Sequence, residues 1–263
     1  MRLVLGFVAL NAFAGALSLM VFTTGTSATF FWTIAPPINA AMFGALYLAA
    51  GLAVAVAAIR GLWEPARYLA PMIPAFTGMM LVTTLLHLDR LDHGFELYYW
   101  IFIYVFAPLA GIFLYVSHER GGADWHVESS SVSGQLRVAA IVVGAATALF
   151  ATVCFVLPSA VVRLWPWTIS VLMVRVFASW LFAFAGALLW FAPERDWARL
   201  RPVGYMLLVT AVLLGLVLGI HSGDVNWSAW TAKAFIVAVV CIGVLGAAIA
   251  RDRVGSSRRA IRA

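Results

Sequence analysis

Charged side chains are scarce in this sequence. Asp, Glu, Lys and Arg together make up 11% of its 263 residues, whereas a soluble domain carries roughly 25%. So few charges cannot cover a surface in contact with water, and the composition therefore argues against a soluble globular protein. Lysine is almost missing, because Lys233 is the only lysine among the 17 basic residues.

The sequence is also poor in cysteine. Cys154 and Cys241 are its only two cysteines, and both lie in long apolar stretches. No further pair is present to build a disulfide framework. The spacings C-x-x-C and H-E-x-x-H, which are typical of metal and redox sites, do not occur, and neither does a glycine-rich phosphate loop. The sequence therefore points away from disulfide-stapled secreted domains and from the enzymes that these motifs mark.

Long apolar runs fill most of the chain. Hydrophobic residues make up 64% of it, and a helix needs ~20 of them to cross a hydrocarbon core of about 30 Å. Eight stretches have that length and contain no Asp or Glu, so we predict an all-α, polytopic membrane protein with eight transmembrane helices. The predicted helices are residues 3–22, 38–59, 68–88, 97–116, 138–157, 169–191, 203–220 and 232–250.

The basic residues are distributed unevenly between the two sets of helix ends. Thirteen of the 17 lie at the ends that share a side with the N-terminus, and only Arg90, Arg163 and Lys233 lie at the opposite ends. Short loops rich in Lys and Arg remain in the cytoplasm. We therefore predict that both termini are cytoplasmic. The same placement of charge indicates that the partner of this basic chain is the lipid bilayer and not nucleic acid.

The two halves of the sequence resemble each other. A shift of 135 residues, with one deletion later in the half, aligns Trp, Arg and His residues in the same order. The aligned residues are Arg2 with Arg137, Trp32 with Trp167, Gly51 with Gly186, Trp63 with Trp197, Arg67 with Arg201, and His87 with His221. Because each half holds four predicted helices, both enter the membrane from the same side, as parallel repeats do. We therefore divide the chain into a first repeat at 1–116, a cytoplasmic linker at 117–136, and a second repeat with a basic cytoplasmic tail at 137–263.

Arg175 is the one charged residue well inside a predicted helix. A charge at the centre of a bilayer costs at least ~2.5 kcal/mol, and such residues usually face the bundle and mark function. Asn39 holds nearly the equivalent position in the first repeat. We therefore expect Arg175 to face the bundle interior, and we interpret both residues as candidates for binding a small, anionic solute between the repeats. Extension of Arg175 to the interface and simple hydrogen bonds between helices are the structural alternatives.

A second group of candidates lies at the opposite side from the termini. His87, Asp89, Asp92 and His93 fall in the hairpin between the third and fourth predicted helices, and His221 holds the position equivalent to His87. Imidazoles and carboxylates bind divalent metals, and two histidines could hold a haem iron. We interpret these five residues as candidate metal or haem ligands. Solvated histidines and ion pairs within the hairpin would explain the same pattern, and the sequence leaves the cofactor open.

The strings FFWTIAPPINAAMFGALYLA and LLHLDR, together with LWPWTI in the second half, resemble a group of bacterial multi-pass membrane proteins. The resemblance covers most of the chain. It implies the eight-helix architecture and a place in a bacterial cytoplasmic membrane, and it implies no activity.

Three classes of function remain open. The first is a transporter or binder of a small solute between the repeats, and the second is an accessory or structural subunit that contacts another membrane protein. The third is a redox protein that holds a metal or haem through histidines. No carboxylate lies deep in a predicted helix, which argues against proton-coupled transport. An enzyme is the least expected of the three classes.

Overall fold

The computed structural model describes residues 1–26, 30–120 and 131–251. Within these ranges the chain forms nine α-helices, eight of which are long and apolar enough to cross a membrane. This confirms the predicted all-α architecture with eight spans. The helices are α1 (Arg2–Val21), α2 (Pro37–Arg60), α3 (Leu69–Leu86), α4 (Phe95–Arg120), α5 (Gly134–Val156), α6 (Pro158–Leu164), α7 (Val171–Leu189), α8 (Trp197–Ile220) and α9 (Trp230–Arg251). Much of the predicted linker and nearly all of the basic tail lie outside the described residues.

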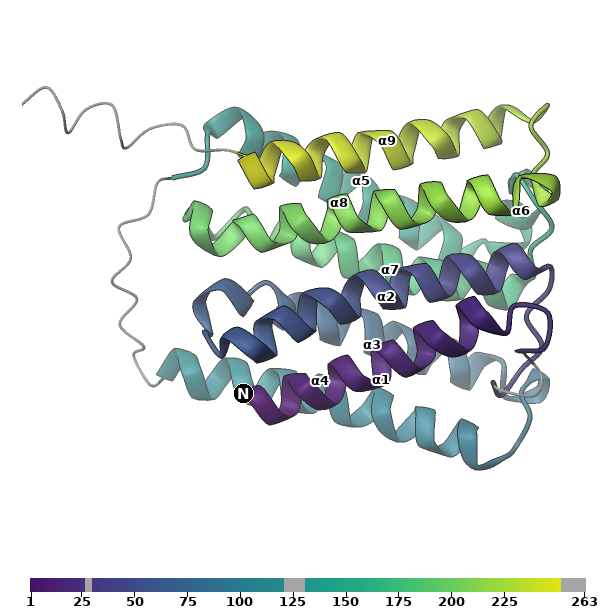
Figure 1. The fold of residues 1–263 in the computed structure, drawn as a ribbon, viewed down its shortest axis with the longest axis horizontal. Helices are drawn as coiled ribbons and strands as arrows, with labels where there is room; N and C mark the ends of the chain where they lie inside the picture. The colour runs from purple at the N-terminus through teal and green to yellow at the C-terminus, as the bar shows by residue number, and fades with distance from the viewer. Residues whose placement is uncertain (27–29, 121–130, 252–263) are drawn as a thin grey trace, which may run out of the picture.

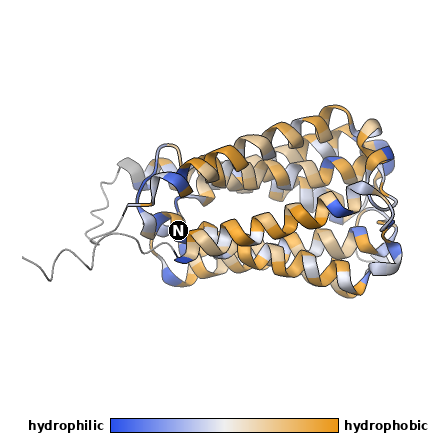
Figure 2. Cartoon of the chain, turned by 90° about the horizontal axis from the view of Figure 1, so that it is seen from above, coloured by the Kyte–Doolittle hydropathy of each residue, from blue (hydrophilic) through white to orange (hydrophobic). Residues whose placement is uncertain are grey.

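The helices lie side by side along the long axis of the molecule, and their connections lie at its two ends (Figure 1). Hydrophobic residues cover the flanks of the helices, whereas hydrophilic residues gather at the two ends (Figure 2). This distribution is expected of a bundle whose flanks face hydrocarbon. The short helix α6 was not predicted. It begins at Pro158, directly after α5, because proline is favoured in the first turn of a helix.

Local sequence sets several helix ends. α2 begins at Pro37 and ends before Gly61, whose φ of 64° is a left-handed conformation that favours glycine. α7 and α8 follow Ser170 and Asp196, whose side chains accept hydrogen bonds from backbone N–H groups in the first helical turn. The ends at Gly61 and Asp196 lie on the same side of the bundle as the N-terminus. We call this the inner end and the opposite side the outer end.

The helix pairs that pack together follow a regular pattern. In the N-terminal half α1 packs on α2 and α3 on α4, and in the C-terminal half α5 packs on α7 and α8 on α9. Between the halves, α3 packs on α7 and α2 packs on α8. α2 and α7 are the two most buried spans, each with 67% of its apolar window inside the bundle. The two halves are therefore held together around α2 and α7.

α8 and α9 cross at two glycines. A β-carbon added to Gly204 would lie 2.7 Å from the backbone nitrogen of Ala250 and 2.8 Å from the carbonyl oxygen of Gly246. A β-carbon added to Gly246 would lie 2.7 Å from the backbone nitrogen of Leu208. Small residues at such a crossing let two backbones approach closely in a membrane. The position of α9 therefore depends on these two residues.

We expect the substitution Gly204→Leu to destabilise the protein, because the new side chain must separate the two backbones. Overpacking of a tight contact costs about 1–3 kcal/mol, so the midpoint of thermal unfolding in detergent should fall by several degrees. Gly215→Leu on the same helix is the matched control, because no atom lies within 4 Å of its added β-carbon. Equal midpoints for the two variants would contradict the close crossing.

Candidate functional site

Arg175 lies near the outer end, in the second turn of α7. Its Nε donates a hydrogen bond to the backbone carbonyl of Phe155 at 3.1 Å, and one terminal nitrogen donates to Nε2 of His87 at 2.9 Å. Phe155 is the penultimate residue of α5, and His87 directly follows α3. The guanidinium therefore faces two neighbouring helices at their C-terminal ends. Because α7 begins only at Val171, Arg175 lies closer to the outer end than the sequence suggested.

The hydrogen bond with Arg175 fixes the protonation state of His87. A guanidinium can only donate, so Nε2 of the imidazole must accept and the ring must be neutral. Burial lowers the pKa of His87, and the positive charge of Arg175 lowers it further. A neutral, almost buried imidazole thus serves as an acceptor that holds the arginine in place.

Asn39 lies in the first turn of α2 and is fully buried. Its Oδ1 accepts a hydrogen bond from the indole N–H of Trp167 at 2.8 Å, and its Nδ2 donates to the carbonyls of Ala35 at 2.9 Å and Thr168 at 3.0 Å. Trp167 and Thr168 belong to the loop before α7. Asn39 therefore joins the two halves and shares no described hydrogen bond with Arg175.

The candidate metal or haem ligands occupy separate positions. His93 contacts the carbonyl of Leu88 at 2.9 Å, Asp89 pairs with Arg90 at 3.8 Å, and His221 lies 3.5 Å from Asp224. The backbone N–H of Asp92 donates to the carbonyl of Phe31. Among the described residues, no group of three His, Cys, Asp or Glu side chains could hold a metal ion. Metal or haem binding by these residues stays a prediction that no described contact supports.

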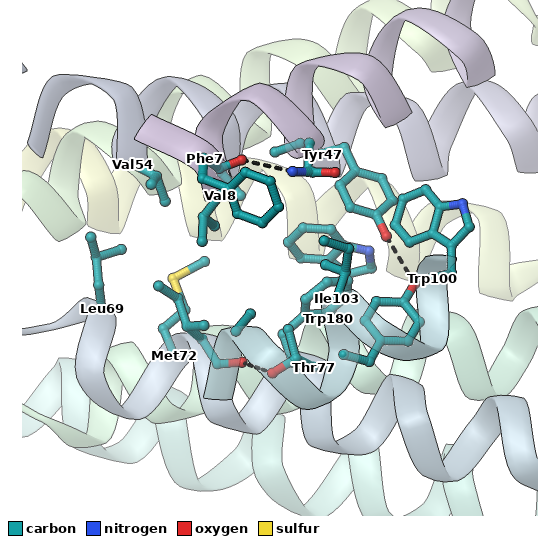
Figure 3. A pocket seen from close by; sticks show the side chains of 17 residues that line it. Phe7, Val8, Tyr47, Val54, Leu69, Met72, Thr77, Trp100, Ile103 and Trp180 are labelled. Atoms are coloured by element: carbon teal, nitrogen blue, oxygen red, sulfur yellow. Dashed lines mark hydrogen bonds between the residues drawn. The ribbon is translucent and has the colours of Figure 1, made fainter. Parts of the chain in front are cut away.

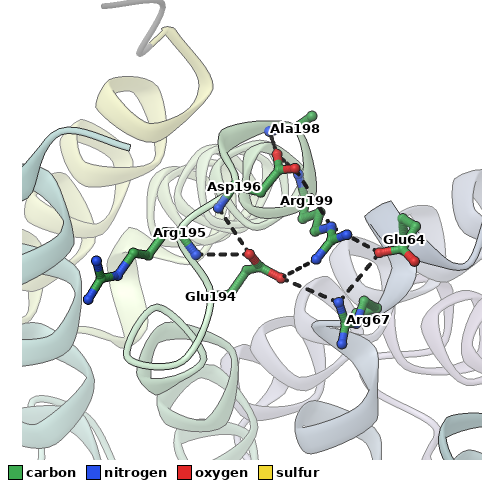
Figure 4. Close-up of polar contacts among 7 residues, drawn as sticks. All are labelled: Glu64, Arg67, Glu194, Arg195, Asp196, Ala198 and Arg199. Atoms are coloured by element: carbon green, nitrogen blue, oxygen red, sulfur yellow. Dashed lines mark hydrogen bonds and ion pairs between the residues drawn. The ribbon is translucent and has the colours of Figure 1, made fainter. Parts of the chain in front are cut away.

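A network of charged residues joins the two halves at the inner end (Figure 4). Glu64 and Arg67 come from the connection between α2 and α3, whereas Glu194 and Arg199 come from the connection between α7 and α8 and the start of α8. Arg199 forms ion pairs with Glu64 at 2.9 Å and with Glu194 at 3.1 Å, and Arg67 lies 3.5 Å from each of the same two acids. Glu64 is only 7% exposed. Two acids and two arginines thus compensate each other where the halves meet.

Glu194 also binds the backbone of its own loop. Its Oε1 accepts hydrogen bonds from the backbone N–H groups of Arg195 at 2.8 Å and Asp196 at 3.0 Å. Burial alone would raise the pKa of the Glu194 carboxyl, but these N–H groups and the guanidinium of Arg199 outweigh it and lower the pKa below its ordinary 4.5. The charged form of Glu194 is therefore stabilised by folding.

A cavity of about 70 Å³ lies inside the N-terminal half (Figure 3). Its walls come from α1, α2, α3 and α4, and Trp180 of α7 adds one residue from the other half. Tyr47, Trp100 and Trp180 gather toward one end of the cavity, and Val54 and Leu69 lie at the other (Figure 3). The cavity is therefore aromatic toward its outer end and aliphatic toward its inner end.

Two hydrogen-bond donors at the aromatic end lack an acceptor. The hydroxyl groups of Tyr47 and Tyr104 lie 3.2 Å apart, and because only one of them can donate to the other, one hydroxyl hydrogen stays free. The indole N–H of Trp180 is buried and has no partner among the described residues. An unsatisfied buried donor costs about 1–3 kcal/mol. These donors lie beside a cavity whose surface is almost entirely apolar.

α1 forms the least buried wall of the cavity. The lining residues on α1 all remain partly exposed, whereas those on α2 are buried. Across the contact between α1 and α4, Tyr99 donates to Oδ1 of Asn11 at 2.6 Å, and the rings of Phe7 and Phe106 meet edge to face at 5.6 Å. The other residues of α1 include exposed leucines such as Leu10 and Leu17. The side of the cavity formed by α1 therefore lies nearest to the surface of the bundle.

Sequence reasoning missed the residues of the charge network and of the cavity. Glu64 and Glu194 were not singled out, and Arg199 was counted only among the basic residues at helix ends, because nothing in the sequence shows that two loops meet. Tyr47 and Trp180 lie within predicted spans, and a polar aromatic far from the interfacial belt is the signal that could have singled them out.

Comparisons with protein-family models, with curated proteins and with solved structures found no match for this chain. The candidate sites therefore rest on the geometry of the bundle. That geometry offers a polar contact at Arg175, a charge network at the inner end, and an apolar cavity with free donors between them.

We expect the stability of the protein to fall at acid pH through Glu194. The pKa of this carboxyl is lower in the folded chain than its ordinary 4.5, so its contribution is complete above that value and is lost as the pH falls through the folded pKa. Thermal unfolding midpoints measured in detergent from neutral pH downward should show this loss.

Glu194→Gln is the control for this pH dependence. The amide cannot titrate, so the variant should be less stable at neutral pH and should lose less on acidification. An acid profile as steep in Glu194→Gln as in the wild type would assign the loss to other groups.

Proposed function

We propose that this chain is a multi-pass membrane protein that binds a slender, apolar molecule with a hydrogen-bond acceptor at one end. The cavity beside Trp180 carries this proposal. Its apolar lining suits a small hydrocarbon group, and beside its aromatic end lie the N–H of Trp180 and one hydroxyl of the Tyr47–Tyr104 pair, which have no acceptor among the described residues. An ester or ketone carbonyl accepts two hydrogen bonds and fits such a pair of donors.

The source of the ligand is inferred from the partly exposed wall of the cavity on α1. A molecule with a hydrocarbon chain is concentrated in the bilayer, and entry past the partly exposed side of α1 does not require it to cross water. Ligand sites are mostly apolar, with few polar groups that fix orientation. A lipid-derived molecule that carries a carbonyl therefore fits this cavity better than a soluble anion does.

This proposal keeps the hypothesis that the protein binds a small molecule, but it places the binding site in the cavity of the N-terminal half. Arg175 and Asn39 were the candidates for a solute site between the repeats, but the described hydrogen bonds of both go to the protein itself. The cavity lies mainly within the N-terminal half. The alternatives of an accessory subunit and of a histidine-based redox protein gain no support from the described contacts.

We further propose that the two halves are parallel repeats related by an axis along the membrane normal. The pattern of helix packing supports this, because exchange of the halves converts the α3–α7 contact into the α8–α2 contact. His87 directly follows α3 and His221 directly follows α8, and both helices end at the outer end of the bundle. Each histidine directly precedes a 3-10 helix, Leu88–Arg90 after His87 and Ser222–Asp224 after His221. The aligned residues thus occupy matching local structures.

Asn39 marks a place where the proposed symmetry is broken. The residue aligned with Asn39 is Val174, and the residue aligned with Trp167 is Trp32. The indole N–H of Trp167 donates to Asn39, whereas that of Trp32 is buried without a described partner. If a two-fold axis relates the halves, Val174 takes the place beside Trp32 that Asn39 takes beside Trp167. The side chain of valine has no hydrogen-bond acceptor, which explains why the indole N–H of Trp32 lacks a described partner.

The cavity can be tested with a small photoreactive ester, methyl 4,4-azipentanoate, because a cavity of about 70 Å³ is too small for a long acyl chain. In lipid nanodiscs we expect the probe to label residues that line the cavity, such as Met72 and Ile73 on α3. Trp180→Phe removes one donor and should lower labelling roughly fivefold, because a neutral hydrogen bond contributes about 1 kcal/mol. Ala50→Phe fills the cavity and should nearly abolish labelling.

The matched control is Ala146→Phe, which adds the same ring at an exposed position on α5. This variant should label as the wild type does, and thermal unfolding should confirm that all three variants are folded. Labelling that persists in folded Ala50→Phe, or that is confined to lipid-facing residues such as Leu109, would refute the cavity as a binding site.

The repeat proposal predicts the outcome of a residue exchange. Asn39→Val leaves the N–H of Trp167 buried and unpaired, which should cost about 1–3 kcal/mol of stability. Val174→Asn added to that variant should restore part of the loss, because the symmetry axis places the new amide against Trp32. Thermal unfolding of the single and double variants tests this, and a double variant no more stable than Asn39→Val would count against the axis.

A further inference from the structure

The charge of Arg175 is not balanced by any acid among the described residues. Arg67 and Arg199 pair with Glu64 and Glu194, and Arg90 lies beside Asp89. The partners of Arg175 are instead a backbone carbonyl and a neutral imidazole. Both neutral acceptors lie at helix C-termini, whose partial negative charge favours a cation but does not neutralise it. Arg175 therefore carries a net positive charge at the outer end of the bundle.

Part of the guanidinium remains available to a ligand. It has five N–H donors, and two of them are used by Phe155 and His87. Arg175 is partly exposed, and none of its nitrogens is among the enclosed atoms that lack a partner. The remaining donors therefore lie at the surface of the bundle.

The protein also holds the guanidinium in a fixed position. Its Nε is tied to α5 and one terminal nitrogen is tied to α3, while its carbon lies 5.7 Å from the centre of the Phe155 ring. With Nε and Nη1 held from two sides, the planar guanidinium leaves Nη2 and the second hydrogen of Nη1 as donors for the oxygens of one anion. His87 thus acts as a positioning residue for this guanidinium.

We propose that Arg175 binds an oxygen-rich anion, a phosphate group, at the outer surface of the bundle. Phe155 and His87 mark the outer ends of two apolar spans, and the headgroups of a bilayer lie at the ends of such spans. The phosphate of an anionic lipid and free inorganic phosphate share this chemistry, and the experiment separates them. The site is independent of the cavity, because its ligand is charged and contacts a different face of α7.

The experiment uses the purified full-length protein in detergent. Phosphatidylglycerol, phosphatidylcholine and inorganic phosphate are added separately at matched ionic strength, and thermal unfolding and lipid retention in native mass spectrometry are measured. A ligand that binds only the folded state raises the unfolding midpoint. We expect phosphatidylglycerol to raise it more than phosphatidylcholine does. Arg175→Met should weaken phosphatidylglycerol binding about tenfold or more, since a charge-assisted hydrogen bond is lost, and Arg175→Lys should weaken it less.

The comparison with and without lipid separates binding from folding. Arg175→Met also removes contacts to α3 and α5 and so changes the stability of the protein itself. The lipid-induced shift of this variant is therefore measured from the unfolding midpoint of the same variant without lipid. Arg163→Met, an exposed arginine on α6 at the same end, is the matched control and should keep the shift. A phosphate-induced shift that competes with phosphatidylglycerol would support the anion site and identify a soluble source. A phosphatidylglycerol shift that is unchanged in Arg175→Met, or lost equally in Arg163→Met, would overturn the proposal.

Discussion

In a hydrocarbon core every backbone N–H and C=O group must find its partner within the chain, and this requirement organises the bundle. The eight spanning helices satisfy most of their own backbone groups, so most unpaired groups lie at helix ends, besides the carbonyls freed by Pro74 in α3 and Pro108 in α4. Side chains bind them there. Arg137 donates to the carbonyls of Phe191 and Ala192 after α7, Trp197 donates to Ile249 near the end of α9, and Arg175 donates to Phe155 near the end of α5. The polar contacts that position the candidate sites are therefore made largely between one helix and the end of another.

The cavity lies where the two proposed repeats differ. Positions 47 and 104 carry tyrosine in the N-terminal half, whereas the aligned positions of the C-terminal half, with the deletion counted for the second, carry Phe182 and Ala238. The hydroxyl pair of the cavity therefore has no counterpart at the aligned positions. A repeated unit needs only one copy of each packing solution to remain stable, so the second copy can lose polar groups that the first retains for a ligand. The asymmetry of the aligned residues thus supports a binding role for the N-terminal half.

The sequence was sufficient to predict the eight spans, because apolar length is a property of consecutive residues. Contacts between distant residues were harder to predict. His87 and Arg175 were both identified as candidates, but His87 was paired with His221 and Arg175 with Asn39, since alignment of the halves was the only guide to proximity. The structure instead pairs His87 with Arg175. Hydrophobic patterns do not specify which helix faces which, so the charge network and the cavity could not be derived from them.

Both proposed sites are built on the contact between α3 and α7. Trp180 and Arg175 are carried by α7, one toward the cavity and the other at the outer end. On α3, Phe76 packs against Trp180 with ring centres 4.0 Å apart, and His87 follows its last residue. Between the two sites the hydroxyl groups of Thr83 and Ser179 lie 3.5 Å apart. The same pair of helices thus supplies both proposed sites, and they remain separate because Arg175 and Trp180, five residues apart on α7, point about 140° apart around the helix axis.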